Sequence, residues 1–131
     1  NILFSKSPSG QSVMKLIDPR GSFGERVNIG DQYYDLAKLR HSTHGGYEFI
    51  INDNFRIAEI QKGEWTLTIP RNPDVMRIFD ELYDKYDRRI IKLIQGLIFI
   101  GMCSRHYDSG ERQLAMYLQG IRTLNSALCE L

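Results

Sequence analysis

The chain has 131 residues, which is the length of one compact domain. With 42% hydrophobic and 25% charged residues, its composition excludes a disordered chain, and a net charge of +1 gives no general attraction to nucleic acid or anionic membranes. Cys103 and Cys129 form neither a disulfide framework nor a metal-binding spacing, so we expect a reducing, cytoplasmic setting. The longest apolar run, residues 97–103, is too short to span a membrane.

Two short apolar runs near the start of the chain predict a β-hairpin over residues 1–18. Residues 1–5 and 13–18 each have the composition of a strand, and the loop between them contains Pro8 and Gly10. Residues 19–30, with three glycines, are predicted to be an irregular loop. Because the chain opens directly on an apolar strand, we expect it to be a piece of a longer protein.

The middle of the chain changes from helical to alternating periodicity. Asp31 is positioned to cap a helix over residues 31–44, with Tyr33, Leu36, Ala37 and Leu39-Arg40 on one face and Gly45-Gly46 at its end. Within residues 47–69, apolar residues alternate on both sides of Lys62-Gly63, which predicts a second β-hairpin. Residues 48–52 fit either a helix or a strand.

The remainder, residues 73–129, is predicted to be helical. Asn72-Pro73-Asp74 is a helix start signal for a segment over 73–85 whose apolar face carries Val75, Ile78, Phe79 and Leu82. A segment over 87–105 is apolar almost all round in its later half, which predicts a central buried helix. The last helix, over 111–128, carries the large residues Leu114, Tyr117, Leu118, Ile121, Leu124 and Leu128. The predicted fold is one domain over residues 1–131, mainly α with small β-hairpins (α+β).

Asn1 and Asp18 are the first candidates for chemistry. If the two N-terminal strands pair, these residues lie side by side at the open end of the hairpin. An amide oxygen and a carboxylate form a hard, all-oxygen pair of ligands that suits Mg²⁺, which phosphoryl transfer uses to bridge nucleotide phosphates. On the other reading, Asn1 is simply the end of a strand and Asp18 belongs to an ordinary Asp-Pro turn.

Three stretches in this order resemble the second half of the aminoglycoside phosphotransferase and choline-kinase-like family, which has a protein-kinase-like fold. They are Asn1-Ile2-Leu3-Phe4, Leu16-Ile17-Asp18 and Tyr34-Asp35-Leu36-Ala37. The resemblance implies that Asn1 and Asp18 bind the metal and that Asp35 supports the catalytic loop. Asp18-Pro19-Arg20-Gly21 and the segment over residues 30–39 look closest to bacterial members associated with surface-polysaccharide or sugar metabolism.

The resemblance implies the C-terminal lobe of a kinase that transfers the γ-phosphate of ATP, with Mg²⁺, to a hydroxyl of a small molecule. The His-Gly-Asp motif that carries the family's general base, and the nucleotide lobe, do not occur in the sequence. We therefore expect this chain to be inactive by itself. We also expect the exposed N-terminal strand, with Ile2, Leu3 and Phe4, to promote self-association.

The alternative function is a non-catalytic helical domain that binds other proteins. In that case Asp35 is a structural carboxylate in the first turn of its helix. His41 and His44, three residues apart, could share a helix face as metal ligands, but the sequence offers no evident third ligand.

Overall fold

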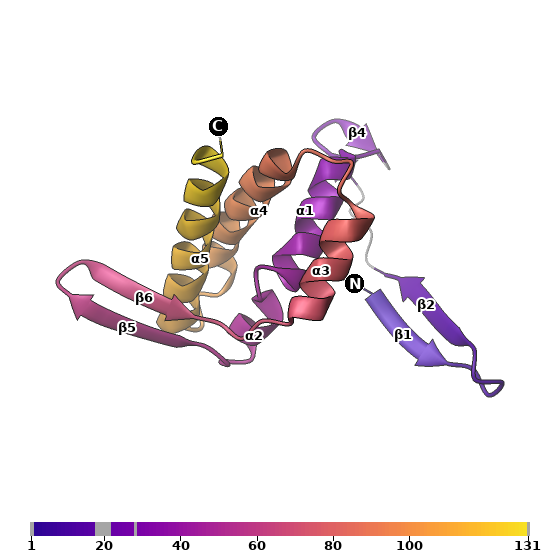
Figure 1. The fold of residues 1–131 in the computed structure, drawn as a ribbon, viewed down its shortest axis with the longest axis horizontal. Coiled ribbons are helices and arrows are strands. Elements are labelled where there is room, and N and C mark those ends of the chain that lie inside the picture. Colours follow the sequence, from indigo (N-terminus) through magenta and orange to yellow (C-terminus); the bar gives the residue numbers. More distant parts are fainter. Residues whose placement is uncertain (1, 18–21, 28, 131) are drawn as a thin grey trace. The chain divides into compact units, whose positions relative to one another are not determined.

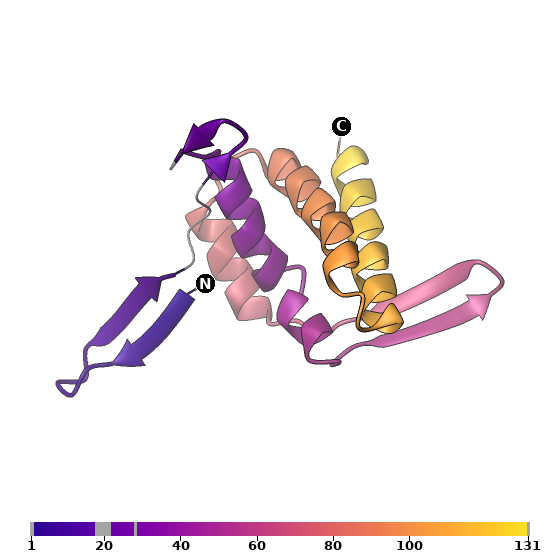
Figure 2. The ribbon, with the colours of Figure 1, turned by 180° about the vertical axis from the view of Figure 1, so that it is seen from behind.

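The structure is a computed structural model that describes residues 2–17, 22–27 and 29–130. It confirms the mixed α+β class. Its residues group into two compact units, Asn1–Asp31 and Gln32–Leu131, each of which is described by itself (Figures 1 and 2). None of the described helices combines the length and the apolar character needed to cross a membrane.

The first unit contains the predicted N-terminal hairpin. Strand β1 (Ile2–Lys6) pairs antiparallel with β2 (Ser12–Leu16), with Ile2 opposite Leu16 and Lys6 opposite Ser12. The Ser7 amide donates to the Gln11 carbonyl at 2.8 Å, and Gly10 takes a φ of 81°, which only glycine adopts easily. Part of the predicted loop forms a second small pair, β3 (Ser22–Phe23) with β4 (Arg26–Val27), which the sequence analysis missed.

The N-terminal hairpin carries apolar side chains that are largely open to solvent. The register places Ile2, Phe4 and Met14 on one face, and they are 53%, 63% and 68% exposed. A two-stranded hairpin gains little stability alone, because it buries little apolar surface. This face is therefore available for contacts with other chains.

The second unit is mainly helical. It contains α1 (Gln32–Thr43), α2 (Tyr47–Ile51), α3 (Pro73–Leu82), α4 (Arg88–Met102), the 3₁₀ turn η1 (Cys103–Arg105) and α5 (Gly110–Leu128). Helix α4 packs against both α1 and α5, and α1 also packs against α3. Asn72 caps α3 by accepting a hydrogen bond from the Val75 amide at 3.2 Å, as the sequence predicts. The hairpin of β5 (Arg56–Gln61) and β6 (Glu64–Thr68) extends away from the helices (Figure 1).

The hairpin predicted over residues 47–69 begins later in the chain than expected. Residues 47–51 form α2, because Gly46 takes a φ of 70° and its carbonyl accepts the first helical hydrogen bonds. The paired strands begin only at Arg56, and Lys62-Gly63 makes the predicted turn. Glu59 lies opposite Trp65 and Gln61 opposite Glu64, so Ile60 is the extra residue of a bulge. The bulge explains why apolar and polar residues do not alternate strictly along β5.

The large residues of α5 are divided between partly buried and exposed positions, and Leu114, Leu118 and Leu124 are half-buried. Tyr117, Ile121 and Leu128 are exposed. The buried face is made of smaller or polar residues: Ala115, Met116, Gln119, Gly120, Thr123 and Ala127. On α3, likewise, Phe79 is buried, whereas Val75, Ile78 and Leu82 are exposed.

Two glycines explain why α5 turns its small residues inward. A Cβ at Gly96 of α4 would lie 2.6 Å from Leu124 Cγ and 3.1 Å from the Gly120 carbonyl oxygen of α5. A Cβ at Gly120 would lie 2.7 Å from Ile100 Cδ1. The two helices cross at a distance that only glycine permits, so the interface selects small side chains over large ones.

We predict that Gly96→Ala lowers the free energy of unfolding by about 1–3 kcal/mol, because the added methyl group overpacks this crossing. Gly101→Ala on the same helix is the matched control, since a Cβ at Gly101 meets nothing within 4 Å. The control is expected to raise stability by about 0.5 kcal/mol through helix propensity. Urea unfolding measures both variants, and a shift in the same direction for the two would contradict the close crossing.

The exposed hairpin face predicts self-association of this chain. Phe4→Lys places a charge on that face, and we expect it to weaken association in sedimentation velocity at micromolar concentration. Tyr107→Lys replaces a residue that is 85% exposed outside the hairpin and serves as the control. A wild-type chain that stays monomeric over this range would overturn the prediction.

Candidate functional site

Of the three residues that the family resemblance singles out, Asp35 alone belongs to the described part of the chain. Asn1 and Asp18 lie outside it. Asp35 occupies the first turn of α1, is exposed, and has no hydrogen bond or ion pair with the described residues. Among those residues there is also no group of three His, Cys, Asp or Glu side chains that could hold a metal ion.

His41 is a buried core residue. Its ring lies between Tyr47 and Phe99, with centroid distances of 4.5 and 4.0 Å, and it is 1% exposed. Burial lowers the pKa of His41 to about 3, with Lys38 adding to the effect, so the ring is neutral at pH 7. Its Nε2 has no hydrogen-bond partner among the described residues. These contacts assign His41 to packing rather than to a shared metal site with His44.

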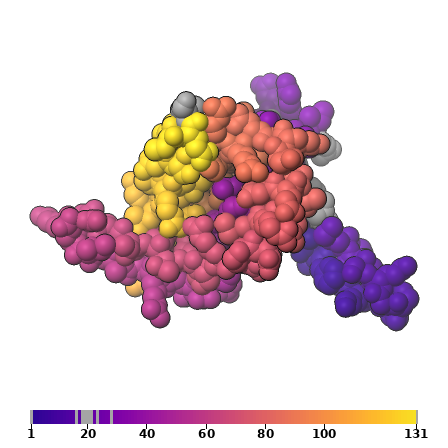
Figure 3. Space-filling model, viewed as in Figure 1, coloured from indigo at the N-terminus to yellow at the C-terminus, as the bar shows by residue number. Residues whose placement is uncertain are grey.

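A hollow of about 110 Å³ lies among α1, α3 and α4. In the space-filling view, part of α1 is visible at the bottom of a depression framed by α3, α4 and α5 (Figure 3). The lining of the hollow combines cations, one carboxylate and apolar walls: Arg40, Phe79, Asp80, Tyr83, Arg88, Ile91 and Lys92.

Arg40 projects from α1 beside this hollow and is held by a neutral partner. Its Nη1 donates to Oε1 of Gln95 on α4, and Gln95 Nε2 donates back to the Arg40 carbonyl at 3.4 Å. Gln95 is 1% exposed. Burial lowers the pKa of Arg40, and the charges of Arg71 and Arg88 add to this, against Asp80 and Glu130. Arg40 therefore carries a partly desolvated charge with no ion pair to a described residue.

The neighbouring cations differ in how they are compensated. Lys92 forms an ion pair with Glu130. Arg88 donates from Nη2 to the backbone carbonyl of Asp80 at 3.4 Å, not to its carboxylate. Arg71 has no hydrogen bond or ion pair within the described part of the chain, and its charge reaches Arg40, His44 and Arg122, where it acts to lower each pKa.

The carboxylate in the hollow, Asp80, faces a histidine. Its Oδ1 lies 3.3 Å from His44 Nε2, close enough for an ion pair but without the alignment of a hydrogen bond. Burial lowers the pKa of His44, and Arg40 lowers it further, against the opposing effect of Asp80. His44 is therefore neutral at pH 7 and leaves the charge of Asp80 uncompensated.

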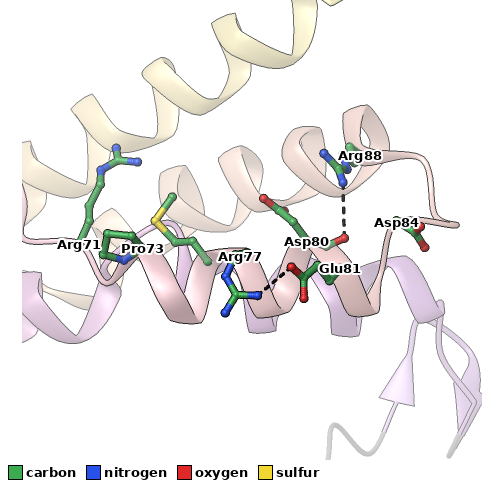
Figure 4. A pocket seen from close by; sticks show the side chains of 8 residues that line it. Arg71, Pro73, Arg77, Asp80, Glu81, Asp84 and Arg88 are labelled. Atoms are coloured by element: carbon green, nitrogen blue, oxygen red, sulfur yellow. Dashed lines mark hydrogen bonds and ion pairs between the residues drawn. The ribbon is translucent and has the colours of Figure 1, made fainter.

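The hollow adjoins an open groove of about 640 Å³ along α3, and Asp80 and Arg88 line both (Figure 4). In the groove Arg77 pairs with Glu81 at 2.8 Å, whereas Arg71 stands apart (Figure 4). The remaining lining residues are Pro73, Met76 and Asp84. Together the hollow and the groove form the candidate site, and its chemistry is that of polar and anionic recognition.

Sequence reasoning missed this site. The sequence analysis places Arg40 beside Leu39 on the apolar face of its helix and assigns it no role. The signal that could have revealed the site is Arg40 itself, a charged residue on the same helix face as the buried Leu36 and Ala37. A charge in such a position needs a partner, which only the assembled helices reveal.

The chain was compared with protein-family models, curated proteins and solved structures. No family model, curated protein or solved structure matches it.

The buried neutral His41 predicts a loss of stability in acid. The unfolded chain takes up a proton as the pH falls below the ordinary pKa of 6.5, whereas the folded chain resists until about pH 3. The contribution of neutral His41 to the free energy of unfolding is thus complete above pH 6.5, and it is lost progressively between pH 6.5 and 3. At pH 5.5 we expect a loss of about 1 kcal/mol relative to pH 7.5. Urea unfolding of His41→Leu should lose this pH dependence, and His106→Gln should keep it; equal slopes in the wild type and His41→Leu would contradict the assignment.

Proposed function

We propose that this chain is the metal- and acceptor-binding part of an ATP-dependent small-molecule phosphotransferase, and that its helical unit belongs to a kinase-like C-terminal lobe. The main support for this proposal is the register of β1 and β2. With Ile2 opposite Leu16, the chain enters β1 and leaves β2 at the same end of the hairpin. In the sequence, Asn1 comes directly before Ile2, and Asp18 comes two residues after Leu16.

In this proposal, the oxygens of Asn1 and Asp18 hold Mg²⁺ against the phosphates of ATP. Mg²⁺ takes oxygen ligands, and in phosphoryl transfer it neutralises the charge that develops on the transferred group. The acceptor hydroxyl is oriented by an Asp of the longer protein, upstream of Asn1. Asp35, which is exposed and has no partner among the described residues, accepts hydrogen bonds from the catalytic loop to which that Asp belongs.

The surface of the hairpin supports a role inside a larger assembly. Ile2, Phe4 and Met14 form an exposed apolar face, which two strands alone do not stabilise. A nucleotide-binding lobe in the longer protein would cover this face and hold the metal-binding end rigid.

The second candidate is a non-catalytic helical domain that binds other proteins, in which the Asp18 segment is only a turn. The exposed row of Val75, Ile78 and Leu82 on α3 favours it, because their spacing places them on one side of the helix. Such a row is typical of a surface that receives a partner helix.

The test is phosphate transfer by the longer protein, with ATP, Mg²⁺ and a panel of small hydroxyl compounds. We expect acceptor-dependent turnover that stops when Mg²⁺ is chelated. Asp18→Asn should reduce kcat by about 100-fold or more, because it removes a charged metal ligand. Asp74→Asn, in the exposed first turn of α3, is the matched control and should retain turnover. Turnover that is unchanged in Asp18→Asn, or no turnover and no Mg²⁺-dependent nucleotide binding, would favour the interaction domain.

A further inference from the structure

We propose that the hollow beside Arg40 binds the phosphate group of a phosphorylated sugar, with the sugar ring in the adjoining groove along α3. The inference depends only on described residues of the helical unit. It goes beyond the proposed function and does not require it.

Charge is the first argument. Arg40, Arg71 and Arg88 have no carboxylate partner among the described residues, and Asp80 faces a neutral histidine. Counted over the hollow and the adjoining groove, these three guanidinium groups face two carboxylates that have no cationic partner among the described residues, Asp80 and Asp84, so positive charge is in excess by one. A phosphate group is an anion with several acceptor oxygens, so it can balance this excess and also pair with more than one guanidinium group.

The size and walls of the hollow are the second argument. Its volume of about 110 Å³ is the space of three to four water molecules, at about 30 Å³ for each, which suits a tetrahedral oxyanion. A sugar ring is larger and needs the open groove of about 640 Å³. Phe79, Tyr83 and Ile91 supply apolar walls, and in such surroundings a charge-assisted hydrogen bond is stronger than in water.

The donors are the third argument. Arg40 and Arg88 come from two different helices, α1 and α4, and both line the hollow. The planar guanidinium presents paired donors that match phosphate oxygens. The hydrogen bonds with Gln95 already hold the Arg40 side chain in place, so little side-chain freedom is lost when an anion binds.

The groove explains why the phosphate should be attached to a polyhydroxylated molecule. Asp80, Glu81 and Asp84 line it, and their carboxylates accept hydrogen bonds from hydroxyl groups. Glu81 is held by Arg77, which leaves Asp80 and Asp84 as the freer acceptors. A second anionic group in the groove would meet these carboxylates and be repelled.

Isothermal titration calorimetry on the full chain tests the proposal with three probes: inorganic phosphate, glucose 6-phosphate and glucose. We expect saturable binding of both phosphates, tighter for glucose 6-phosphate, and none of glucose. Arg40→Gln and Arg88→Gln should each weaken binding by about tenfold or more, because both side chains line the hollow and each substitution removes a charge that faces the phosphate. Asp80→Asn should tighten the binding of inorganic phosphate, because it removes a repelling charge.

Arg56→Gln, on β5 and away from the hollow, is the matched control and should bind like the wild type. Arg88 is exposed, and Arg88→Gln therefore decides the outcome if Arg40→Gln fails to fold by circular dichroism. The proposal is overturned if no phosphate binds saturably, or if Arg88→Gln and a folded Arg40→Gln bind as tightly as the wild type. Binding of inorganic phosphate without glucose 6-phosphate would overturn the assignment to a sugar phosphate.

Discussion

The helical unit depends on a polar contact between two packed helices. Arg40 of α1 and Gln95 of α4 hydrogen-bond to each other, and Gln95 has almost no contact with solvent. Loss of either side chain would leave the other partly or fully buried without its partner, which costs more than the bond itself contributes. The same contact holds a cationic head beside the hollow, so the interaction that orders α1 against α4 also produces the candidate site. Where α4 meets α5, Gly96 and Gly120 let the two helices approach closely.

Local signals predicted much of the fold. Helix α1 ends with the Gly45-Gly46 pair, as expected, the Asn72 cap starts α3, and the Lys62-Gly63 turn joins β5 to β6. The failures occurred where tertiary packing overrides local pattern. On α5 the glycine crossing buries the small residues fully, whereas the large residues are half-buried or exposed. The candidate site was not predictable, because Arg40, Asp80 and Arg88 lie on three helices and are brought together only by packing. The predicted metal ligands Asn1 and Asp18 stand outside the described residues.

The two units carry different chemistry. The N-terminal hairpin has an apolar face and, in the sequence just beyond its paired residues, an amide and a carboxylate suited to Mg²⁺. The helical unit has an excess of positive charge in a hollow of the size of a phosphate group. In a phosphotransferase, the first chemistry would hold the nucleotide phosphates, and the second would recognise an acceptor that already carries a phosphate. Each can be tested without the other, since the metal proposal depends on the hairpin and the anion proposal on α1, α3 and α4.

The most direct test of the metal proposal is to replace Mg²⁺ with paramagnetic Mn²⁺ in the intact protein and record amide resonances by NMR in the presence of nucleotide. The account predicts strong broadening for Ile2 and Ile17, at the end of the hairpin where Ile2 pairs with Leu16, and little for Ser9 and Gly10 in the turn at the other end. Asp18→Asn should abolish this difference in broadening between the two ends of the hairpin. Broadening that is absent, or that is equal at the two ends of the hairpin, would contradict a metal site formed by Asn1 and Asp18.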